Sequence, residues 1–274
     1  MTSTTISSRN KKRIAQQFSR AANTYNSVAD VQLDIAFDAL AYLPSHYKTG
    51  LDIGCGTGRI SQRLSDRCDR LVAMDLAFGM LAYAQQNNEI PDPSICWLQG
   101  DADSLPLASG SVDMLFSSMV LQWAENQHLV MSEISRVMAP GAKAILAIMC
   151  DGSFTQLNDS WSSIDSHRHV NDFATAESWS DAAKQQGLQV NMREKQYITW
   201  HHDIKKLLSS IKSIGANVLL SSQSSPAINS TLSQNKSALN RKTLQHLETY
   251  YQQKYAENMQ LPLTYQVCFL HCSK

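Results

Sequence analysis

Short apolar runs alternate along this chain with stretches in which apolar residues recur every three or four positions. The runs that predict strands are residues 51–53, 70–74, 95–99, 111–117, 143–149, 188–200 and 263–271. The stretches with helical spacing are residues 60–64, 78–86, 129–138, 176–186, 201–217 and 241–257. Strands that alternate with helices form a mostly parallel sheet with helices on both faces. The pattern predicts a doubly wound α/β fold of seven strands, with its ligand crevice at the carboxyl ends of the strands.

Two helices are expected before the first strand. Ile14, Phe18, Ala22 and Tyr25 recur at helical spacing, and a second helix is expected over residues 28–42. Such helices lie outside the sheet, so they could form a lid that excludes water from the crevice or could simply bury apolar surface. The expected organisation is an N-terminal helical lid (1–45), a ligand-binding core (46–150) and a C-terminal part of the same domain (151–274) with a second lid around 201–260.

Two boundaries in the second half of the chain follow from local signals. The helix at 129–138 is expected to end at the turn Pro140-Gly141, just before the fifth strand. Residues 221–237 are rich in serine and are expected to form a loop.

The first strand runs into a turn with three glycines at alternate positions. Gly54, Gly56 and Gly58 can adopt positive φ and leave bare backbone for a ligand. The dinucleotide-binding fingerprint has a third glycine where this chain has Arg59. The order GxGxG after the acidic Asp52 resembles motif I of the class I methyltransferases, which implies S-adenosylmethionine as the cofactor. The alternative is a tight strand-to-helix turn with no ligand.

Polar residues follow each of the next three strands. Asp75 comes about twenty residues after the glycine turn, where an acidic side chain can bind both ribose hydroxyls. Asp101 and Ala102 follow the third strand and could meet the adenine, and Ser117 ends the fourth. The expected cofactor contacts are Gln32, Asp52, Gly54, Cys55, Gly56, Gly58, Asp75, Leu76, Asp101, Ala102 and Ser117.

Composition limits the class of protein. The chain has 274 residues, 43% of them hydrophobic, which is enough for one large domain with its own core. No apolar run has the length of a membrane span, and the polar N-terminus has no signal-peptide core, so a cytoplasmic protein is expected. The six cysteines include no CxxC pair, which favours free thiols, and no metal site is expected.

The formal net charge is zero, from 24 basic and 24 acidic residues, but the charges are unevenly distributed. Five basic residues and no acidic residue precede Asp30, and residues 204–242 contain six basic residues and no acidic one. These segments are either solvated faces or the receiving surface for an acidic partner. They lack interleaved aromatic residues and a recognisable RNA-binding module, which argues against nucleic acid.

Several segments along nearly the whole chain resemble the malonyl-acyl-carrier-protein O-methyltransferases that begin the synthesis of biotin's pimelate moiety. The segments are 15–25, 51–58, 100–106, 121–123, 169–173, 214–217 and 261–265. The core motifs are shared with many small-molecule methyltransferases, whereas His169-Val-Asn171, Gly215-Ala-Asn217 and Leu261-Pro-Leu-Thr-Tyr265 are more particular. Ala77 and Ala142 depart from the usual serine and glycine, which bears only on fine positioning.

The resemblance implies methyl transfer from S-adenosylmethionine to the free carboxylate of a malonyl thioester, within a fold whose last strand is antiparallel. A carboxylate is already ionised at neutral pH, so no general base or nucleophile is expected. The expected positioning residues are Tyr25, Trp123, His169, Asn171, Asn217 and Tyr265, with Gln32 of the first lid. Arg20 or Arg168 could hold the carboxylate. The carrier protein is acidic, and the expected docking residues are Arg9, Lys11, Lys12, Arg13, Lys205, Lys206 and Lys212.

Each positioning residue has an alternative structural role: tyrosines with a satisfied hydroxyl, Trp123 as a core anchor, His169 as a hydrogen-bond donor. Two other functions remain open at this point. One is a generic small-molecule methyltransferase, such as one acting on a quinone precursor or a carboxylic acid. The other is a noncatalytic protein that binds S-adenosylmethionine. A monomer is expected.

Overall fold

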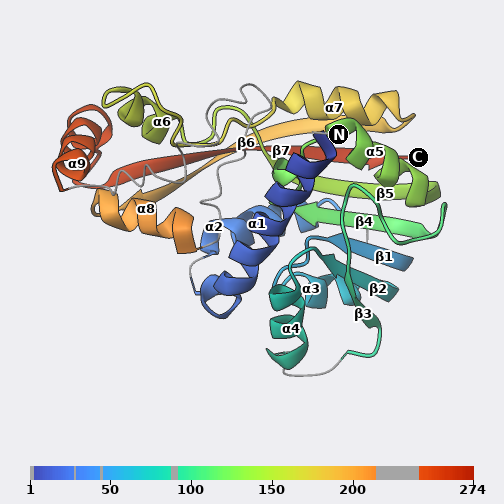
Figure 1. The fold of residues 1–274 in the computed structure, drawn as a ribbon. Coiled ribbons are helices and arrows are strands. Elements are labelled where there is room, and N and C mark those ends of the chain that lie inside the picture. The colour runs from blue at the N-terminus through green and yellow to red at the C-terminus, as the bar shows by residue number, and fades with distance from the viewer. Residues whose placement is uncertain (1–2, 28, 44–45, 88–91, 214–240) are drawn as a thin grey trace.

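A seven-stranded sheet forms the centre of the protein in this computed structural model, which describes residues 3–27, 29–43, 46–87, 92–213 and 241–274. The strands are β1 (Tyr47–Ile53), β2 (Cys68–Asp75), β3 (Ile95–Gln99), β4 (Val112–Ser118), β5 (Met138–Met149), β6 (Gln189–His201) and β7 (Leu261–Ser273). Their order in the sheet is β3-β2-β1-β4-β5-β7-β6 (Figure 1). The first five strands pair in parallel, and β7 is antiparallel to both of its neighbours. The predicted doubly wound sheet with an antiparallel last strand is confirmed.

Helices cover both faces of the sheet, as the strand patterns require. Met114 and Phe116 of β4 pack toward α2 (Asp30–Leu40), α3 (Ser61–Ser65) and α4 (Phe78–Asn87). Leu115, between them, packs on the other face against α5 (Gln127–Val137) and α7 (Ala176–Gln185). Alternate residues of a strand point to opposite faces, so a strand buried on both sides is apolar throughout. The continuous apolar runs in the sequence have this cause.

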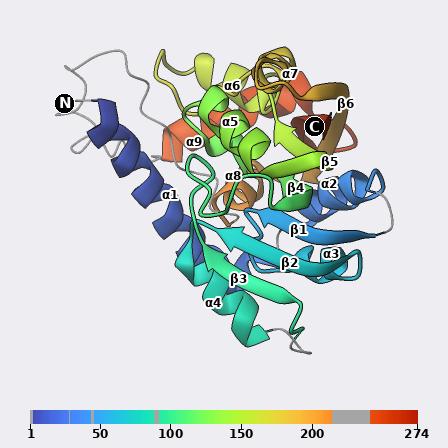
Figure 2. The same cartoon turned by 90° about the vertical axis from the view of Figure 1, so that its right-hand side faces the viewer.

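The remaining helices lie at the edges of this sandwich. Helix α1 (Ser3–Tyr25) crosses the carboxyl ends of the parallel strands, next to α4 (Figures 1 and 2). Helices α6 (Thr155–Ser162), α8 (Ile204–Ser213) and α9 (Arg241–Tyr255) gather around the ends of β6 and β7 that extend beyond the other strands. The first and last thirds of the chain therefore both reach the ligand end of the sheet.

Two boundaries differ from the sequence-based prediction. The helix before β5 ends at Val137, and β5 already begins at Met138 and runs through Pro140-Gly141. A register shift between Val112 and Met114 of β4 accommodates this early start. The sequence does not predict helix α6, because the residue before it, Phe154, has no side chain that could cap a helix. In the structure Phe154 has φ +60°. The predicted serine-rich loop and Asn217 lie outside the described residues.

Candidate active site

Three pockets meet at the carboxyl ends of the parallel strands. The large pocket holds about 870 Å³ of empty space, including its open mouth, which is enough for a nucleoside-sized ligand. Its wall includes Lys11, Phe18, Gly54, Asp75, Asp101 and Trp123. The glycine pocket lies between the glycine turn and α2 and includes Gln32, Asp52, Cys55, Gly56 and Arg59. The aromatic pocket is lined by Phe18, Tyr25, Gln32, Met119, Gln122, Trp123, Met149, Phe154 and Tyr265. Tyr25 lines all three pockets and so marks their junction.

The glycine turn has the shape that its sequence predicts. Gly54, Gly56 and Gly58 have φ of +75°, +56° and +80°. A Cβ atom on Gly54 would lie 2.1 Å from Cγ2 of Val120, and one on Gly58 would lie 2.5 Å from the ring of Trp97. A Cβ on Gly56 would meet no atom within 4 Å. Gly54 and Gly58 are therefore required by packing, whereas Gly56 borders open space in which a ligand can approach the backbone.

Asp75 holds the turn and faces the large pocket. Its Oδ2 accepts a hydrogen bond from the Gly56 N–H at 2.9 Å, and its Oδ1 accepts one from the Ala77 N–H at 2.7 Å. Burial raises the pKa of this carboxyl group, and the backbone hydrogen bonds offset part of that rise. The Leu76 N–H also interacts with this carboxylate, so three of its roughly four lone pairs are taken by the backbone. Asp75 can therefore accept a ribose hydroxyl group without releasing the loop.

The carboxyl group of Asp52 makes the stability of the free protein depend on pH. Burial raises the pKa of Asp52 to about 7, although Ser61 Oγ donates a hydrogen bond to it at 2.7 Å. The fold disfavours the ionised form of Asp52. Its contribution to the free energy of unfolding is therefore fully present below about pH 4, where the group is protonated in both states, and is lost as the pH rises to about 7.

We expect Asp52→Asn to remove this loss, on the order of 2–4 kcal/mol, in denaturant titrations across that pH range. The slope that remains in the variant belongs in part to Asp75, whose pKa is also raised. A variant with the same slope as the natural protein would show that Asp52 is ionised throughout.

Helix α1 is held over the large pocket by polar contacts. Lys11 Nζ lies 2.6 Å from Asp101 Oδ2 and 2.5 Å from Asp103 Oδ2. The Gly79 N–H donates to Ser19 Oγ at 3.1 Å, and a Cβ atom on Gly79 would lie only 2.7 Å from Ser19 Cβ. These contacts join α1 to the first turn of α4 and to the loop after β3. Lys11, expected on a docking surface, is instead paired inside the protein.

The turn between α1 and α2 is fastened to the glycine loop. Thr57 Oγ1 donates to Asn26 Oδ1 at 2.6 Å, and Arg59 Nη1 donates to the Asn26 backbone oxygen at 3.2 Å. Asn26 follows Tyr25 directly, so the same contacts hold the Tyr25 ring at the junction of the pockets. Asn26 belongs to no recognisable sequence motif, so its role is evident only from these contacts.

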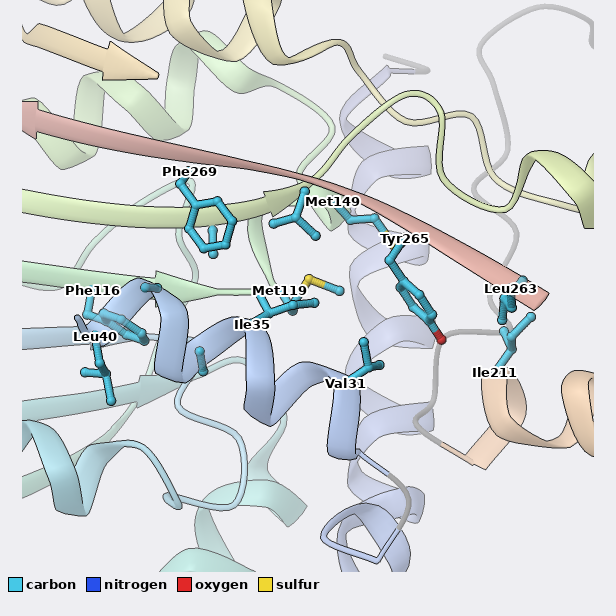
Figure 3. Close-up of a cluster of buried hydrophobic side chains, with 14 of the residues drawn as sticks. Val31, Ile35, Leu40, Phe116, Met119, Met149, Ile211, Leu263, Tyr265 and Phe269 are labelled. Atoms are coloured by element: carbon cyan, nitrogen blue, oxygen red, sulfur yellow. The ribbon is translucent and has the colours of Figure 1, made fainter. Parts of the chain in front are cut away.

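Aromatic rings and two strained residues shape the aromatic pocket. Phe18 packs edge-on against Trp123 with ring centroids 6.0 Å apart, and Phe154 packs in the same way against Tyr265 at 5.0 Å. Met119 and Phe154 have φ of +58° and +60°, a conformation that L residues rarely adopt and that clusters at functional sites. Figure 3 shows the Tyr265 ring standing away from β7, near Val31 of α2 and Ile211 of α8.

The tyrosine hydroxyls of this pocket are neutral donors at physiological pH. Burial raises the pKa of Tyr25 to about 12, and the charge of Asp75 adds to the rise. Burial also raises the pKa of Tyr265, and the nearby Tyr25 adds to it. Among the described residues, the wall of the aromatic pocket contains no Lys, Arg or His. The pocket can therefore present hydrogen-bond donors to an anion without a formal positive charge of its own.

Polar atoms without a partner gather at the pockets. Gln32 Oε1, Ser118 Oγ and Gln122 Oε1 are buried and make no hydrogen bond, and all three residues line a pocket. Buried polar atoms are rarely left unpaired in native proteins. These three atoms are therefore candidates to bind a ligand. Ser118 and Gln122 had not been proposed as site residues from the sequence.

Twelve of the residues expected to bind the cofactor or position the substrate line the pockets. They are Tyr25, Gln32, Asp52, Gly54, Cys55, Gly56, Asp75, Leu76, Asp101, Ala102, Trp123 and Tyr265. Gly58 lines none of the pockets and packs closely against the Trp97 ring. The Ser117 hydroxyl donates to the Ile53 backbone oxygen at 2.9 Å, inside the sheet, and the next residue, Ser118, lines the pockets instead.

Four further expected residues, His169, Asn171, Arg168 and Arg20, line none of these pockets. His169 stacks on Trp161 with centroids 3.9 Å apart and hydrogen-bonds Asp165, and Asn171 is buried close by in sequence. Arg168 Nη1 pairs with Asp172 at 3.2 Å. Arg20 is exposed on α1. Neither arginine lines any of the three pockets, so the structure gives no support to either as the group that holds an anion there.

The predicted docking residues fall on two helices that contact each other, α1 and α8. Lys12, Arg13, Lys205, Lys206 and Lys212 are exposed. Arg9 lies in α1, but its side chain is not among the described ones.

Three further observations concern metals, membranes and thiols. No cluster of three His, Cys, Asp or Glu suited to a metal occurs among the described residues. In the same part of the chain, no helix is both long enough and apolar enough to span a membrane. The six cysteines are unbridged, and all but Cys96 are buried.

Residues 51–146 match the family model described as a methyltransferase domain. A malonyl-[acyl-carrier protein] O-methyltransferase from Serratia marcescens is 36% identical over 77% of this chain and 80% of its own length. One from Hahella chejuensis is 34% identical over 76% of this chain and 75% of its own. The biotin biosynthesis bifunctional protein BioHC of Cellvibrio japonicus is 37% identical, and the match spans only 41% of that longer protein.

Solved structures of low identity share the fold. The YcgJ protein from Bacillus subtilis has a TM-score of 0.58 at 15% identity, over 88% of this chain and 97% of that one. A phosphoethanolamine N-methyltransferase 2 of Haemonchus contortus, in complex with S-adenosylhomocysteine, has a TM-score of 0.53 at 19% identity, over 89% of this chain and 52% of that one. At these identities the likeness concerns the fold alone.

Proposed function

This chain belongs to the malonyl-[acyl-carrier protein] O-methyltransferase family, and we propose that it transfers the methyl group of S-adenosylmethionine to the free carboxylate of malonyl-acyl-carrier protein. The observation that carries the proposal is the junction of three pockets at Tyr25. Two of them suit the cofactor, and the third is a narrow, uncharged pocket for the acceptor. The methyl ester would serve biotin biosynthesis, the process for which the bifunctional relative is named.

The pockets fit S-adenosylmethionine on three counts. Gly56 leaves open space above the turn, Asp75 keeps a free lone pair for a ribose hydroxyl, and Ser118 Oγ and Gln32 Oε1 are buried without partners. Asp101 lies just after β3, where its carboxylate can accept a hydrogen bond from the adenine amino group once Lys11 moves away from it. The carboxyl groups of Asp52 and Asp75 suit a ligand that carries a sulfonium and an ammonium group. When bound, the cofactor supplies the electrophilic methyl group.

The residues of the aromatic pocket would orient the acceptor carboxylate and exclude water from it. The malonyl carboxylate is ionised at neutral pH and needs no base. It must be held in line behind the methyl group, at contact distance, away from water. Tyr25 and Tyr265 can donate hydrogen bonds to it, while Phe18, Trp123 and Phe154 form dry walls. The negative charge of the carboxylate disappears during methyl transfer, so any group that stabilises this charge before the reaction raises the barrier to transfer. Neutral hydrogen-bond donors stabilise the charge less than a cation would, and they therefore raise the barrier less.

Helices α1 and α2 act in this proposal as the N-terminal lid (1–45), and α8 belongs to the second lid (201–260). The empty space beside Gly56 and the aromatic pocket favours an enzyme over a protein that only binds the cofactor. A generic small-molecule methyltransferase would need no surface for a carrier protein.

The test of the proposed reaction compares two carrier-bound thioesters. The protein is incubated with S-adenosylmethionine and either malonyl- or acetyl-carrier protein, and the S-adenosylhomocysteine formed is measured. Product is expected with the malonyl form and not with the acetyl form, which has no free carboxylate. Equal turnover of both, or of neither, would contradict the proposal.

We infer that the carrier protein docks on the basic surface formed by Lys12 and Arg13 of α1 and Lys205, Lys206 and Lys212 of α8. All five side chains are exposed, and none of them lines the pockets. Helix α8 contacts both α1 and β7, the strand that carries Tyr265, and Ile211 of α8 belongs to the same apolar cluster as Tyr265 (Figure 3). Such complementarity acts mainly on the rate of encounter.

Reversing the charges of Lys205, Lys206 and Lys212 to Glu is expected to raise KM for malonyl-carrier protein about 10- to 100-fold. The KM for the small malonyl thioester of N-acetylcysteamine should change less than about twofold, since this molecule has no acidic surface. The matched control reverses Lys48, Lys143 and Lys184, three exposed lysines elsewhere on the protein. Equal losses with both substrates would place the effect inside the pocket and remove α8 from the docking surface.

A further inference from the structure

Gln122 has one polar atom that the protein leaves unused. This residue lies in the 3-10 turn Leu121–Trp123 after β4. Its Nε2 donates a hydrogen bond to the Met119 backbone oxygen at 2.7 Å, and its Oε1 is buried without a partner. Exchanging the two atoms would place two oxygens against each other at Met119. The orientation of the amide is thus set by its environment, and the orphan atom is an acceptor.

The strained turn before Gln122 fixes this orientation. Met119 has φ +58°, and its N–H donates to the Ala147 backbone oxygen at 2.8 Å. The left-handed residue points its carbonyl oxygen at the Gln122 amide. A strained conformation that persists in a fold is commonly tied to function.

The place of Gln122 in the aromatic pocket indicates which part of a bound ligand it contacts. Phe18, Tyr25, Gln32, Met119 and Trp123 line the aromatic pocket and also a cofactor pocket. The other four residues of the aromatic pocket, Gln122, Met149, Phe154 and Tyr265, line neither cofactor pocket. They line the part of the aromatic pocket that it does not share with a cofactor pocket, and within this part the long Tyr265 side chain reaches back toward Tyr25. Gln122 therefore faces the part of the acceptor that lies beyond its reacting carboxylate.

The acceptor offers few partners for a buried oxygen. An ionised malonyl thioester has oxygen and sulfur atoms but no hydrogen-bond donor. In a carrier-bound thioester the first donor after the carboxylate is the amide N–H of the phosphopantetheine arm, two methylene groups beyond the sulfur. Coenzyme A thioesters share this group, whereas simple alkyl thioesters lack it.

We propose that Gln122 Oε1 accepts a hydrogen bond from the first amide N–H of the arm that carries the malonyl group. This subsite for a secondary amide rests on the proposed function. Through this hydrogen bond the enzyme would prefer a carboxylate that belongs to a thioester on such an arm. A free dicarboxylic acid, or an ester without the amide, leaves the buried oxygen unpaired.

The test is a cycle of one substitution in the protein and one in the substrate. The substrates are the malonyl thioester of N-acetylcysteamine and its analogue in which a CH₂ group replaces the amide N–H. The natural protein is expected to show a kcat/KM about tenfold higher for the amide. In Gln122→Met, which keeps the side-chain length without the acceptor, the preference should fall below about twofold.

Gln266→Met is the matched control. Gln266 Oε1 is also buried without a partner, but this residue lies in β7 and lines none of the three pockets. The control should keep the tenfold preference. Because the ratio is taken within each protein, a general loss of activity or stability cancels. Gln122→Leu gives the same comparison if Gln122→Met does not fold.

The outcomes separate this subsite from the proposed function. A natural protein that methylates both thioesters equally well overturns the subsite and leaves the methyl transfer standing. A preference that survives in Gln122→Met or Gln122→Leu also overturns it. A natural protein that methylates neither thioester, nor malonyl-carrier protein, overturns both proposals. Loss of the preference in the Gln122 variants alone supports the subsite.

Discussion

Replacing Gly56 by asparagine is expected to weaken the binding of S-adenosylmethionine about 100-fold, or ~3 kcal/mol, without unfolding the protein. Gly56 has φ +56°, and asparagine is among the residues that best tolerate this region. A side chain here would meet no protein atom within 4 Å of its Cβ, so the free protein can accommodate it. It would instead fill the space above the turn, where the account places the cofactor.

The control for this variant is another glycine with the same two properties. Gly110 has φ +65°, a Cβ on it would also meet nothing within 4 Å, and it lines none of the pockets. Gly110→Asn should bind the cofactor as the natural protein does in isothermal titration calorimetry. Both variants should lose less than about 1 kcal/mol of stability. Unchanged affinity in Gly56→Asn would mean that the cofactor does not occupy this space.

Replacing Tyr25 by phenylalanine is expected to lower kcat/KM for malonyl-carrier protein about 30- to 100-fold. The ring that packs at the junction of the pockets remains, and only the hydroxyl is lost. That hydroxyl stays protonated up to its pKa of about 12, so it donates a hydrogen bond at any physiological pH. Without it the carboxylate has one positioning contact fewer, and a small misalignment of an in-line transfer is costly. The affinity for S-adenosylmethionine should change less than about threefold.

Tyr83→Phe is the control for this prediction. Tyr83 packs in the same small apolar cluster as Tyr25, with Ala22, Ala77 and Met80, but lines none of the pockets. Single-turnover measurements at saturating cofactor separate transfer from binding. Equal rates of transfer in Tyr25→Phe and the natural protein would assign Tyr25 a packing role only. A matching loss in Tyr83→Phe would trace the effect to the packing of α1.

The sequence predicts the sheet well because its signals are local. A continuous apolar run indicates a strand buried on both faces, and the strand ends that carry Asp75 and Asp101 follow directly. The start of β5 is harder to predict, because Pro140-Gly141 normally indicates a turn and only pairing with β4 extends the strand through it. Helix α6 is hard to predict for a similar reason. The left-handed residue just before it, Phe154, is held by a hydrogen bond from its N–H to the Thr264 backbone oxygen of β7.

Within the site, the residues that could be predicted are those that belong to a motif. The glycine turn and the acidic strand ends were placed correctly at the pockets. At the end of β4 the sequence predicts a contact by Ser117, whereas Ser118 lines the pockets. Adjacent strand residues point to opposite faces, and periodicity alone does not say which of the two faces a pocket. The partner of Lys11, the tether at Asn26 and the orphan oxygen of Gln122 depend on contacts between distant segments. No local pattern encodes such contacts.

The most direct test of the proposed methyl transfer is the intact mass of malonyl-carrier protein after incubation with this protein and S-adenosylmethionine. The carrier is expected to gain the mass of one CH₂ unit, the difference between a carboxylic acid and its methyl ester. Mild ester hydrolysis should remove that gain, and Gly56→Asn should form the product much more slowly at cofactor concentrations near the Kd of the natural protein. An unchanged carrier mass with the natural protein would contradict methyl transfer to the malonyl carboxylate.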